Sequence, residues 1–178
     1  MSVITSLERG KTITAVCCVS AAGVYCPPFL IFPRKRFKPE LMDRGPVGAV
    51  GVANPSGWIN ESVFVQWFDH FLQFFQPKHR NTPSLLIMDG HTNHTNNLEL
   101  VIKARENNVD LLVLPSHCTH KIQPLDVAIF KSLKSHYNTA IDTWLHAHPG
   151  RGVQESNIAE LFSQAWERLP QWQMPSMA

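Results

Sequence analysis

Charged side chains are scarce in this sequence. They make up 17% of the 178 residues and leave a formal net charge of only +2, whereas apolar residues make up 44%. This composition is typical of a globular chain with a core of its own, and it excludes intrinsic disorder. So small a net charge does not by itself argue for nucleic-acid binding, and any such surface must come from local clusters of Lys and Arg.

Long apolar runs are also missing. No segment approaches the roughly 20 residues that span a membrane, and Met1–Lys11 lacks the apolar core of a signal peptide. We therefore expect no membrane association. The GxSxG motif is absent as well, and Cys118 follows a predicted strand with no clear activating group, so a serine or cysteine hydrolase is poorly supported.

Cysteines are few, and their spacing matches no disulfide framework. The four are Cys17, Cys18, Cys26 and Cys118. The adjacent pair should point to opposite faces of a strand. We therefore expect reduced thiols, as in intracellular proteins.

Two short apolar runs organise the chain. Ser84–Met88 is followed by Asp89, Asp110–Leu114 is followed by Pro115, and a polar segment of helical length separates the runs. Such runs are typical of buried parallel strands in a βαβ unit. Ligands of these sheets gather at the carboxyl ends of the strands, so Asp89 is predicted to lie at a binding site.

A third segment brings a second carboxylate toward the same place. Gln123–Asp126 opens a long amphipathic helix, in which Pro124 suits the first turn and Asp126 lies near the positive end of the helix dipole. Carboxylates that project from rigid elements toward one point can bind a hard divalent cation. We therefore predict that Asp89 and Asp126 approach one another. The plain alternative is a turn-making Asp89 and a helix-capping Asp126.

The first part of the chain predicts a β-hairpin. Thr12–Ser20 and Val24–Phe32 are rich in β-branched and apolar residues and flank a short turn. Pro27 and Pro28 cannot donate to a strand ladder, so the second strand should lie at an edge or be bulged there. The Gly- and Pro-rich stretch Pro39–Trp58 is predicted to be a long connection.

Two helices are predicted around the first apolar run. Asn60 caps the helix Asn60–Gln76, and Leu98–Asn107 forms the second, with Val101 and Ile102 turned inward. The first helix carries an apolar stripe that we assign to the core rather than to stacking on bases. Its members are Phe64, Trp67, Phe68, Phe71, Leu72 and Phe75.

Two more helices are predicted after the second run. One extends from Pro124 to about His146, and the other, capped by Ser156, extends through Leu169. Each has one apolar face. These faces consist of Phe130, Leu133, Tyr137, Ile141 and Trp144 in the first helix, and Ile158, Leu161, Phe162, Ala165 and Trp166 in the second.

Basic residues cluster at two places. They are Arg34, Lys35, Arg36 and Lys38 after the hairpin, and Lys131 and Lys134 near the start of the long helix. Such clusters suit contact with DNA phosphates. The plain alternative for the first cluster is a solvated loop that keeps the hairpin soluble.

Several stretches closely resemble a known family. They include SGWINESVFVQWFDHF, LLIMDGHTNH and LLVLPSHCTHKIQPLDVAIFKSLKSHYN. They resemble the DDE superfamily endonuclease domain in its pogo/Tigger/jerky branch, which is related to mariner transposases and to domesticated proteins such as centromere protein B. The resemblance extends from about Glu8 to Trp166. The pairing of DGHxxH with LPxHxTHxxQPLDxxxFxxLK is far more specific than a lone short motif.

The resemblance implies an α/β fold of ribonuclease H type. Residues 1–178 would form one three-layer domain, with a mixed sheet flanked by helices and a frayed tail over residues 170–178. The hairpin and the strands before Asp89 and Pro115 would share one sheet. DNA is the implied partner, the nucleus the implied location, and a homo-oligomer is compatible with the family.

The resemblance also implies metal-dependent DNA cleavage and strand transfer. In the family, three acidic residues hold two Mg²⁺ or Mn²⁺ ions. Asp89 matches the second acid and Asp126 the third, while His91 and His94 match histidines that orient these groups. The basic residues near the start of the long helix match a face that approaches DNA phosphates.

The family's first acid has no match. It lies on a central strand upstream of the segment that corresponds to Glu8–Gly10, and the family's helix-turn-helix domains also precede it. We therefore expect an N-terminally truncated domain that lacks this strand and is inactive alone. The alternative is a domesticated, catalytically silent module that binds DNA or protein. A zinc site is the third interpretation, although its residues match no structural zinc pattern. They are His91, His94, His117, Cys118 and His120.

Overall fold

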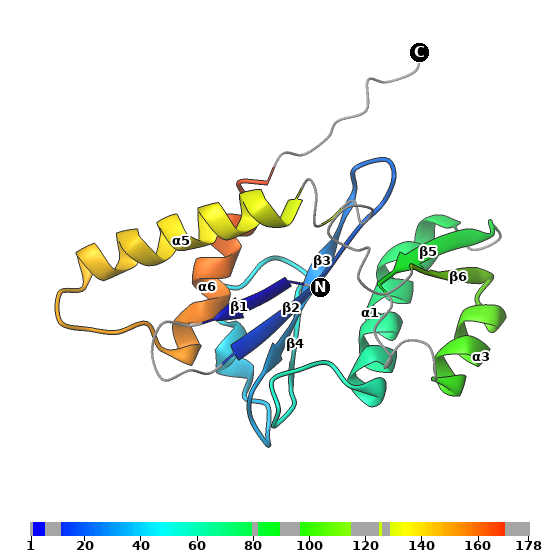
Figure 1. Ribbon diagram of the computed structural model, residues 1–178, viewed down its shortest axis with the longest axis horizontal. Helices are drawn as coiled ribbons and strands as arrows, with labels where there is room; N and C mark the ends of the chain where they lie inside the picture. The colour runs from blue at the N-terminus through cyan, green and yellow to red at the C-terminus, as the bar shows by residue number, and fades with distance from the viewer. Residues whose placement is uncertain are drawn as a thin grey trace, which may run out of the picture. The chain divides into compact units, whose positions relative to one another are not determined.

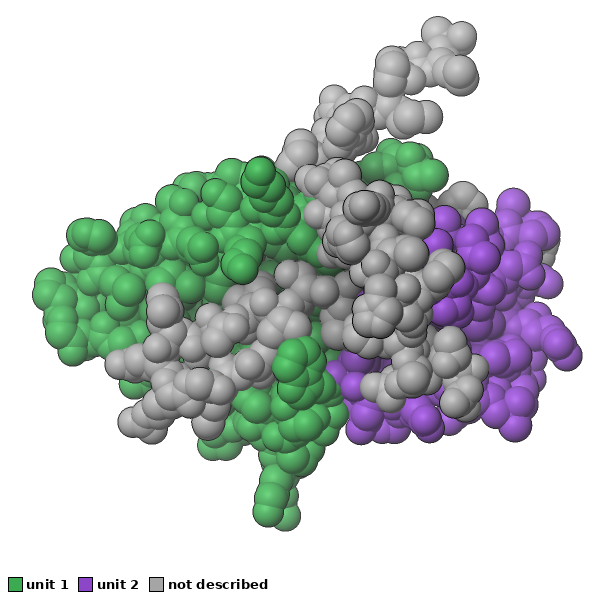
Figure 2. All heavy atoms as spheres, in the orientation of Figure 1, with its two compact units in different colours: residues 1–58, 128–178 green, residues 59–127 purple. Residues whose placement is uncertain are grey.

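The computed structural model describes residues 2–5, 12–79, 82–89, 97–114, 125 and 129–169. Strands and helices mix along the chain, which confirms the α/β class (Figure 1). The chain divides into two compact units (Figure 2). The first contains residues 1–58 and 128–178, and the second contains residues 59–127.

A four-stranded sheet forms the centre of the first unit. Its strands β1 (Ser2–Thr5), β2 (Thr12–Val19), β3 (Tyr25–Phe32) and β4 (Val50–Ala53) lie in this order. The pairs β1–β2 and β2–β3 are antiparallel, and β4 is parallel to β3. The predicted hairpin is therefore confirmed as β2 and β3, at the middle of the sheet (Figure 1).

A bulge interrupts the hairpin at its two prolines. Val16 pairs with Phe29 and Cys18 with Cys26, so two steps along β2 match three along β3. The extra residue lies at Pro27–Pro28. Proline has no backbone N–H, so the bulge costs the ladder no hydrogen bond from these two residues. The predicted bulge is confirmed. The alternative of an edge strand is wrong for Phe29–Phe32, which pair with β4 on the other side of β3, whereas Pro27 and Pro28 lie outside this pairing.

The stretch predicted as a long connection contains structure of its own. It forms a 3-10 helix, η1 (Pro39–Met42), and the strand β4. A β-carbon at Gly51 would lie 2.7 Å from the Met42 Sδ and from the Phe37 Cε2. Only glycine allows so close an approach, and a glycine within four residues weakens the strand signal in the sequence.

Two helices of the first unit pack against one another. They are α5 (Phe130–Ala147) and α6 (Glu155–Trp166). Their predicted apolar faces are buried, except that Trp144 and Trp166 are half-buried. The Trp166 ring meets Tyr25 edge-on at 5.5 Å and thereby connects α6 to β3.

The predicted cap of the last helix is wrong. The N-cap is Gln154, not Ser156, because Gln154 and Asn157 form a reciprocal capping box. The Asn157 Oδ1 accepts from the Gln154 N–H at 3.0 Å. The helix also ends at Trp166, before the predicted Leu169. For the long helix, the described residues form α-helix from Phe130, and Pro124 lies outside them.

The second unit begins with α1 (Glu61–His79). Asn60 is its cap, as predicted, since its Oδ1 accepts from the Val63 N–H at 2.9 Å. The predicted aromatic stripe is core: its members are buried except for the half-buried Phe75. The rings stack along the helix, with the Trp67 and Phe71 centroids 5.8 Å apart. The helix therefore contributes its aromatic side to the interior rather than to a ligand.

A parallel strand pair completes the second unit. The strands β5 (Ser84–Met88) and β6 (Val109–Val113) flank α3 (Leu98–Glu106), which confirms the βαβ prediction. Each unit has a sheet of its own, four-stranded in the first and two-stranded in the second, and a single sheet shared by the hairpin and this pair stays a prediction.

The strand pair is buried on one face only. Leu86 and Met88 are buried, whereas Leu85 is 61% and Ile87 is 47% exposed. The predicted burial therefore holds for one face of the pair. Alternation along the strand separates the two sets, because successive side chains point to opposite faces.

The orientation of α3 also differs from the prediction. Val101 and Ile102 are 40% and 49% exposed, and the buried side chains are Leu100 and Ala104. Polar contacts to α1 explain this rotation. The Asn97 side-chain amide donates to the Glu61 carbonyl at 3.0 Å, and the Lys103 ammonium lies 2.7 Å from the Asp69 carboxylate.

A buried hydroxyl connects β2 to the turn after β4. Thr14 is fully buried, and its Oγ1 donates to the Gly57 carbonyl at 2.8 Å. Thr14→Val keeps the volume but leaves this carbonyl without its donor, so we expect the free energy of unfolding to fall by about 1–3 kcal/mol. Urea unfolding measures the loss. Thr14→Ser, which keeps the hydroxyl, should lose less, and equal losses in both variants would contradict the role of the hydrogen bond.

A second buried hydroxyl belongs to Tyr137. The Tyr137 hydroxyl has no hydrogen-bond partner among the described residues, and burial raises the pKa of Tyr137. We expect Tyr137→Phe to raise the free energy of unfolding by about 1 kcal/mol, because the cost of burying the hydroxyl disappears.

In the unfolded chain tyrosine ionises near pH 10, whereas the folded tyrosine stays protonated there. The wild type should therefore lose stability as the pH rises through 10, and the variant should lose less. Chemical denaturation at pH 7 and pH 10.5 tests both expectations, and a less stable variant at pH 7 would contradict them.

Candidate functional site

Asp89 directly follows β5, at the carboxyl end of the strand. Its side chain is only 6% exposed. The Leu114 N–H donates to the Met88 carbonyl at 2.8 Å, so the chain leaving β6 stays bonded to the end of β5. The βαβ unit therefore places a buried carboxylate where sheets of this kind bind their ligands, as the sequence predicts.

The other predicted ligand lies outside the described residues. This ligand is Asp126, and the histidines predicted to orient the carboxylates, His91 and His94, lie outside them as well, so the approach of Asp126 to Asp89 stays a prediction. The alternative zinc site also lies outside them in all of its residues. Leu125, next to Asp126, is described and is half-buried.

The described residues offer one acidic ligand for a hard cation. Among them, no group of three or more His, Cys, Asp or Glu residues could hold a metal ion. Asp89 fits as a single ligand, because carboxylate oxygen is the donor that Mg²⁺ and Mn²⁺ prefer and the end of a paired strand is rigid.

The strand β1 bears on the predicted absence of a first strand. It pairs antiparallel with β2, from Ser2 opposite Ala15 to Thr5 opposite Thr12. This strand is not predictable from the sequence, since four residues carry little signal on their own. Its sequence, SVIT, contains no carboxylate. The strand therefore adds to the sheet and carries no acidic side chain.

The first basic cluster forms the loop after β3. Lys35, Arg36 and Lys38 are exposed. Arg34 is different: its Nε lies 3.3 Å from the Glu155 Oε2 in the first turn of α6, and its side chain is 34% exposed. Arg34 therefore connects the loop to the helix, and the other three basic residues are open to solvent.

The second pair of basic residues is on the first turns of α5. Lys131 and Lys134 are exposed, while Phe130 and Leu133 on the same turns are buried. Residues three apart are neighbours on a helix surface, so the two ammonium groups share one patch. Both lysines are therefore accessible on the surface of α5, as the predicted contact with DNA phosphates requires.

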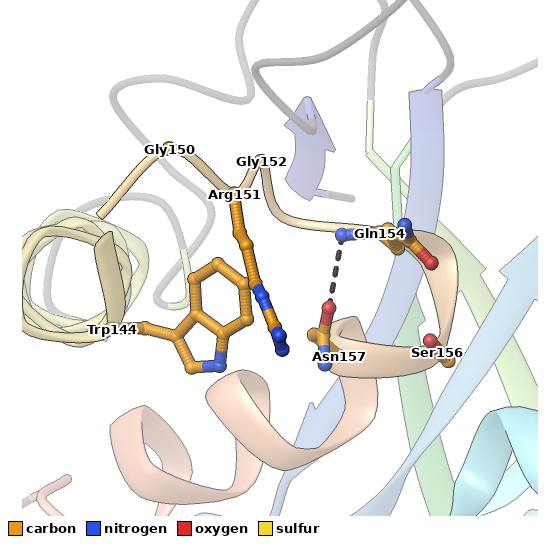
Figure 3. Close-up of a pocket in the computed structure, with 7 residues that line it drawn as sticks. All are labelled: Trp144, Gly150, Arg151, Gly152, Gln154, Ser156 and Asn157. Carbon is orange, nitrogen blue, oxygen red and sulfur yellow. Dashed lines mark hydrogen bonds between the residues drawn. The ribbon is translucent and has the colours of Figure 1, made fainter. Parts of the chain in front are cut away.

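A pocket between the end of α5 and the start of α6 was not predicted (Figure 3). The Arg151 side chain lies alongside the Trp144 indole, which also stacks on His148 at 4.2 Å. Asn157 and Gln154, which form the helix cap, line the opposite side. The sequence HPGRG predicts a break between two helices, but it does not predict a pocket there.

The class of this protein follows from its similarity to a known family. The DDE superfamily endonuclease family matches residues 10–174, and the chain belongs to this family. Its relatives place it further in the pogo-type branch. The recognition made from the sequence motifs is thereby confirmed.

Three relatives illustrate this placement. A pogo transposable element with KRAB domain from Mus musculus is 26% identical over 136 residues, and that from Homo sapiens is 27% identical over 139 residues; each alignment covers 76% of this chain. The MFS-type transporter clz9 from Cochliobolus lunatus is 28% identical over 162 residues, which is 90% of this chain.

The chain spans only a small part of these relatives. It covers 17% of the fungal protein and 22% of each mammalian one. No solved structure matches the chain. Among the described helices, none has both the length and the apolar character to cross a membrane.

Proposed function

We propose that this chain is the DDE-type catalytic domain of a pogo-type transposase relative and acts on DNA in the nucleus. The observation that carries the proposal is the position of Asp89. It is a buried carboxylate at the carboxyl end of a parallel strand, within a region that matches the family. A ribonuclease H-type arrangement of the two units belongs to the same proposal.

The chain's own residues have distinct roles in this proposal. Asp89 and Asp126 would hold the divalent cations, and His91 and His94 would orient these carboxylates. Bound Mg²⁺ or Mn²⁺ would supply the Lewis acid for attack by water or a 3′-hydroxyl and for departure of the leaving oxygen. The exposed basic residues would position the DNA backbone without reading its sequence.

We further propose that these 178 residues do not cleave DNA alone. The family's chemistry needs three acids acting as a unit, and losing one should cost nearly as much activity as losing all. The absence of a carboxylate in β1 supports this. The second candidate function is a catalytically silent module that binds DNA or protein.

Weak, sequence-independent DNA binding is the first expectation. Replacing Lys35, Arg36 and Lys38 by Gln should weaken binding to unrelated duplexes equally. The dependence of log K on log salt should become less steep by roughly 0.7–0.9 for each lost phosphate contact. Fluorescence anisotropy at several salt concentrations measures both. Arg34 is left intact because its contact with Glu155 supports the fold.

A charge-matched variant controls for net charge. Arg105, Arg151 and Arg168 are also exposed. Changing these three to Gln removes the same charge from other surfaces and should leave affinity and salt dependence nearly unchanged. Equal losses in the two triple variants would show that only net charge matters, and unchanged affinity in the first would remove the cluster from the DNA surface.

Metal binding without cleavage is the second expectation. The chain should bind Mn²⁺ weakly in calorimetry and should not nick supercoiled plasmid in Mg²⁺ or Mn²⁺, because two carboxylates do not complete the site. Asp89→Asn should abolish Mn²⁺ binding. Asp110→Asn, which changes an exposed acid at the start of the neighbouring strand, should keep it.

Two results would contradict this reading. Mn²⁺ binding that survives in Asp89→Asn would remove Asp89 from the site. Metal-dependent nicking by the wild type that is lost in Asp89→Asn would show that another residue of the chain replaces the missing acid.

A further inference from the structure

Two cysteines face each other across the central hairpin. In the ladder of β2 and β3, Cys18 is directly opposite Cys26. Cys18 is half-buried, and Cys26 is 3% exposed. The turn Ser20–Val24, closed by a hydrogen bond from the Ser20 N–H to the Val24 carbonyl at 2.9 Å, fixes this register. Neither thiol has a role in the proposed DNA chemistry.

The backbone already provides the spacing of a disulfide. Directly opposite residues of an antiparallel pair have Cα atoms about 4.5–5.5 Å apart. Disulfides join Cα atoms that are about 4.4–6.8 Å apart. The Cα spacing expected from the register therefore falls within the range that a disulfide spans.

The third thiol of the hairpin is placed less well. Cys17 is buried, and it faces the bulge at Pro27–Pro28, where the ladder gives it no register partner. Successive side chains of a strand point to opposite faces, so Cys17 and Cys18 point apart. Of the hairpin thiols, the register favours only the pair Cys18 and Cys26.

We propose that Cys18 and Cys26 are a redox-sensitive pair that forms a cross-strand disulfide on exposure to a small disulfide oxidant such as oxidised glutathione. The Cys18 thiolate attacks a sulfur of the oxidant and releases one small thiol, which leaves a mixed disulfide on Cys18. The Cys26 thiolate then attacks the Cys18 sulfur and releases the second small thiol. The two protons of the cysteines pass to the released thiolates. The oxidant accepts two electrons, and the protein loses two hydrogen atoms.

Burial should make the reaction slow near neutral pH. It raises the pKa of Cys18 to about 11 and that of Cys26 to about 12. The thiolate is the attacking species, so the rate should rise roughly tenfold for each pH unit below these values. The half-buried Cys18 is the more accessible thiol and should react first. The pair therefore resists brief exposure and responds to sustained oxidation.

The test uses the full chain with Cys118→Ser, which leaves the three hairpin thiols. The protein is incubated with reduced and oxidised glutathione at pH 8.5, and the remaining thiols are alkylated in denaturant. Mass spectrometry after cleavage at Tyr25, which separates Cys26 from the other two cysteines, then identifies the bridge. We expect two thiols to be lost, a bridge between Cys18 and Cys26, and free Cys17.

Two single variants make the assignment specific. Cys17→Ser should form the bridge at the same rate as the background, and Cys18→Ser should keep Cys26 as a thiol. The oxidised background should also unfold at a higher temperature than the reduced protein, and a reductant should reverse this shift, because the bridge restricts the unfolded chain. The melting curves also confirm that each variant folds.

Three outcomes would overturn the proposal. One is a bridge that involves Cys17 in the folded protein. Another is a stable mixed disulfide with glutathione that never resolves. The third is protection of all three thiols in the folded chain at pH 8.5 when the same thiols react in denaturant.

Discussion

The ladder between β2 and β3 is the constraint on which the first unit depends. Because this hairpin lies in the middle of its sheet, β1 can add to one side and β4 to the other. Thr14 on β2 holds the turn after β4 through the Gly57 carbonyl, and Tyr25 on β3 meets Trp166 of α6. Elements from both ends of the sequence are thus attached to one pair of strands. The second unit depends instead on the parallel pairing of β5 with β6, which positions Asp89.

Local signals in the sequence were sufficient for much of this fold. Asn60 caps its helix through the next turn alone, and the bulge at Pro27–Pro28 follows from two missing N–H groups. Elements that depend on distant partners were not predictable in this way. The strand β4 pairs with the distant β3 and packs closely on Met42 and Phe37 at Gly51, and neither contact leaves a periodic pattern in the sequence. The register of β1 on β2 is equally non-local.

In the candidate site, too, some features follow from local sequence signals and others depend on distant residues. The position of Asp89 at a strand end follows from the length and composition of the run before it. The orientation of α3 does not, because Val101 and Ile102 fit an inward face as well as Leu100 and Ala104 do. Contacts of Asn97 and Lys103 with α1 decide between the two faces. The ion pair between Arg34 and Glu155 was also not predictable, since the two residues lie far apart in the sequence. This ion pair distinguishes Arg34 from the other members of its basic cluster.

The two prolines of β3 have a consequence for solubility. The strand β4 covers β3 only along Phe29–Phe32, so the segment nearer the turn would otherwise present bare backbone donors along its outer side. At Pro27 and Pro28 there is no N–H to offer, and Gly48 approaches so closely that a β-carbon there would lie 3.1 Å from the Pro27 ring. A strand from another molecule therefore finds no template at this position, and the hairpin resists the edge-to-edge association that begins aggregation.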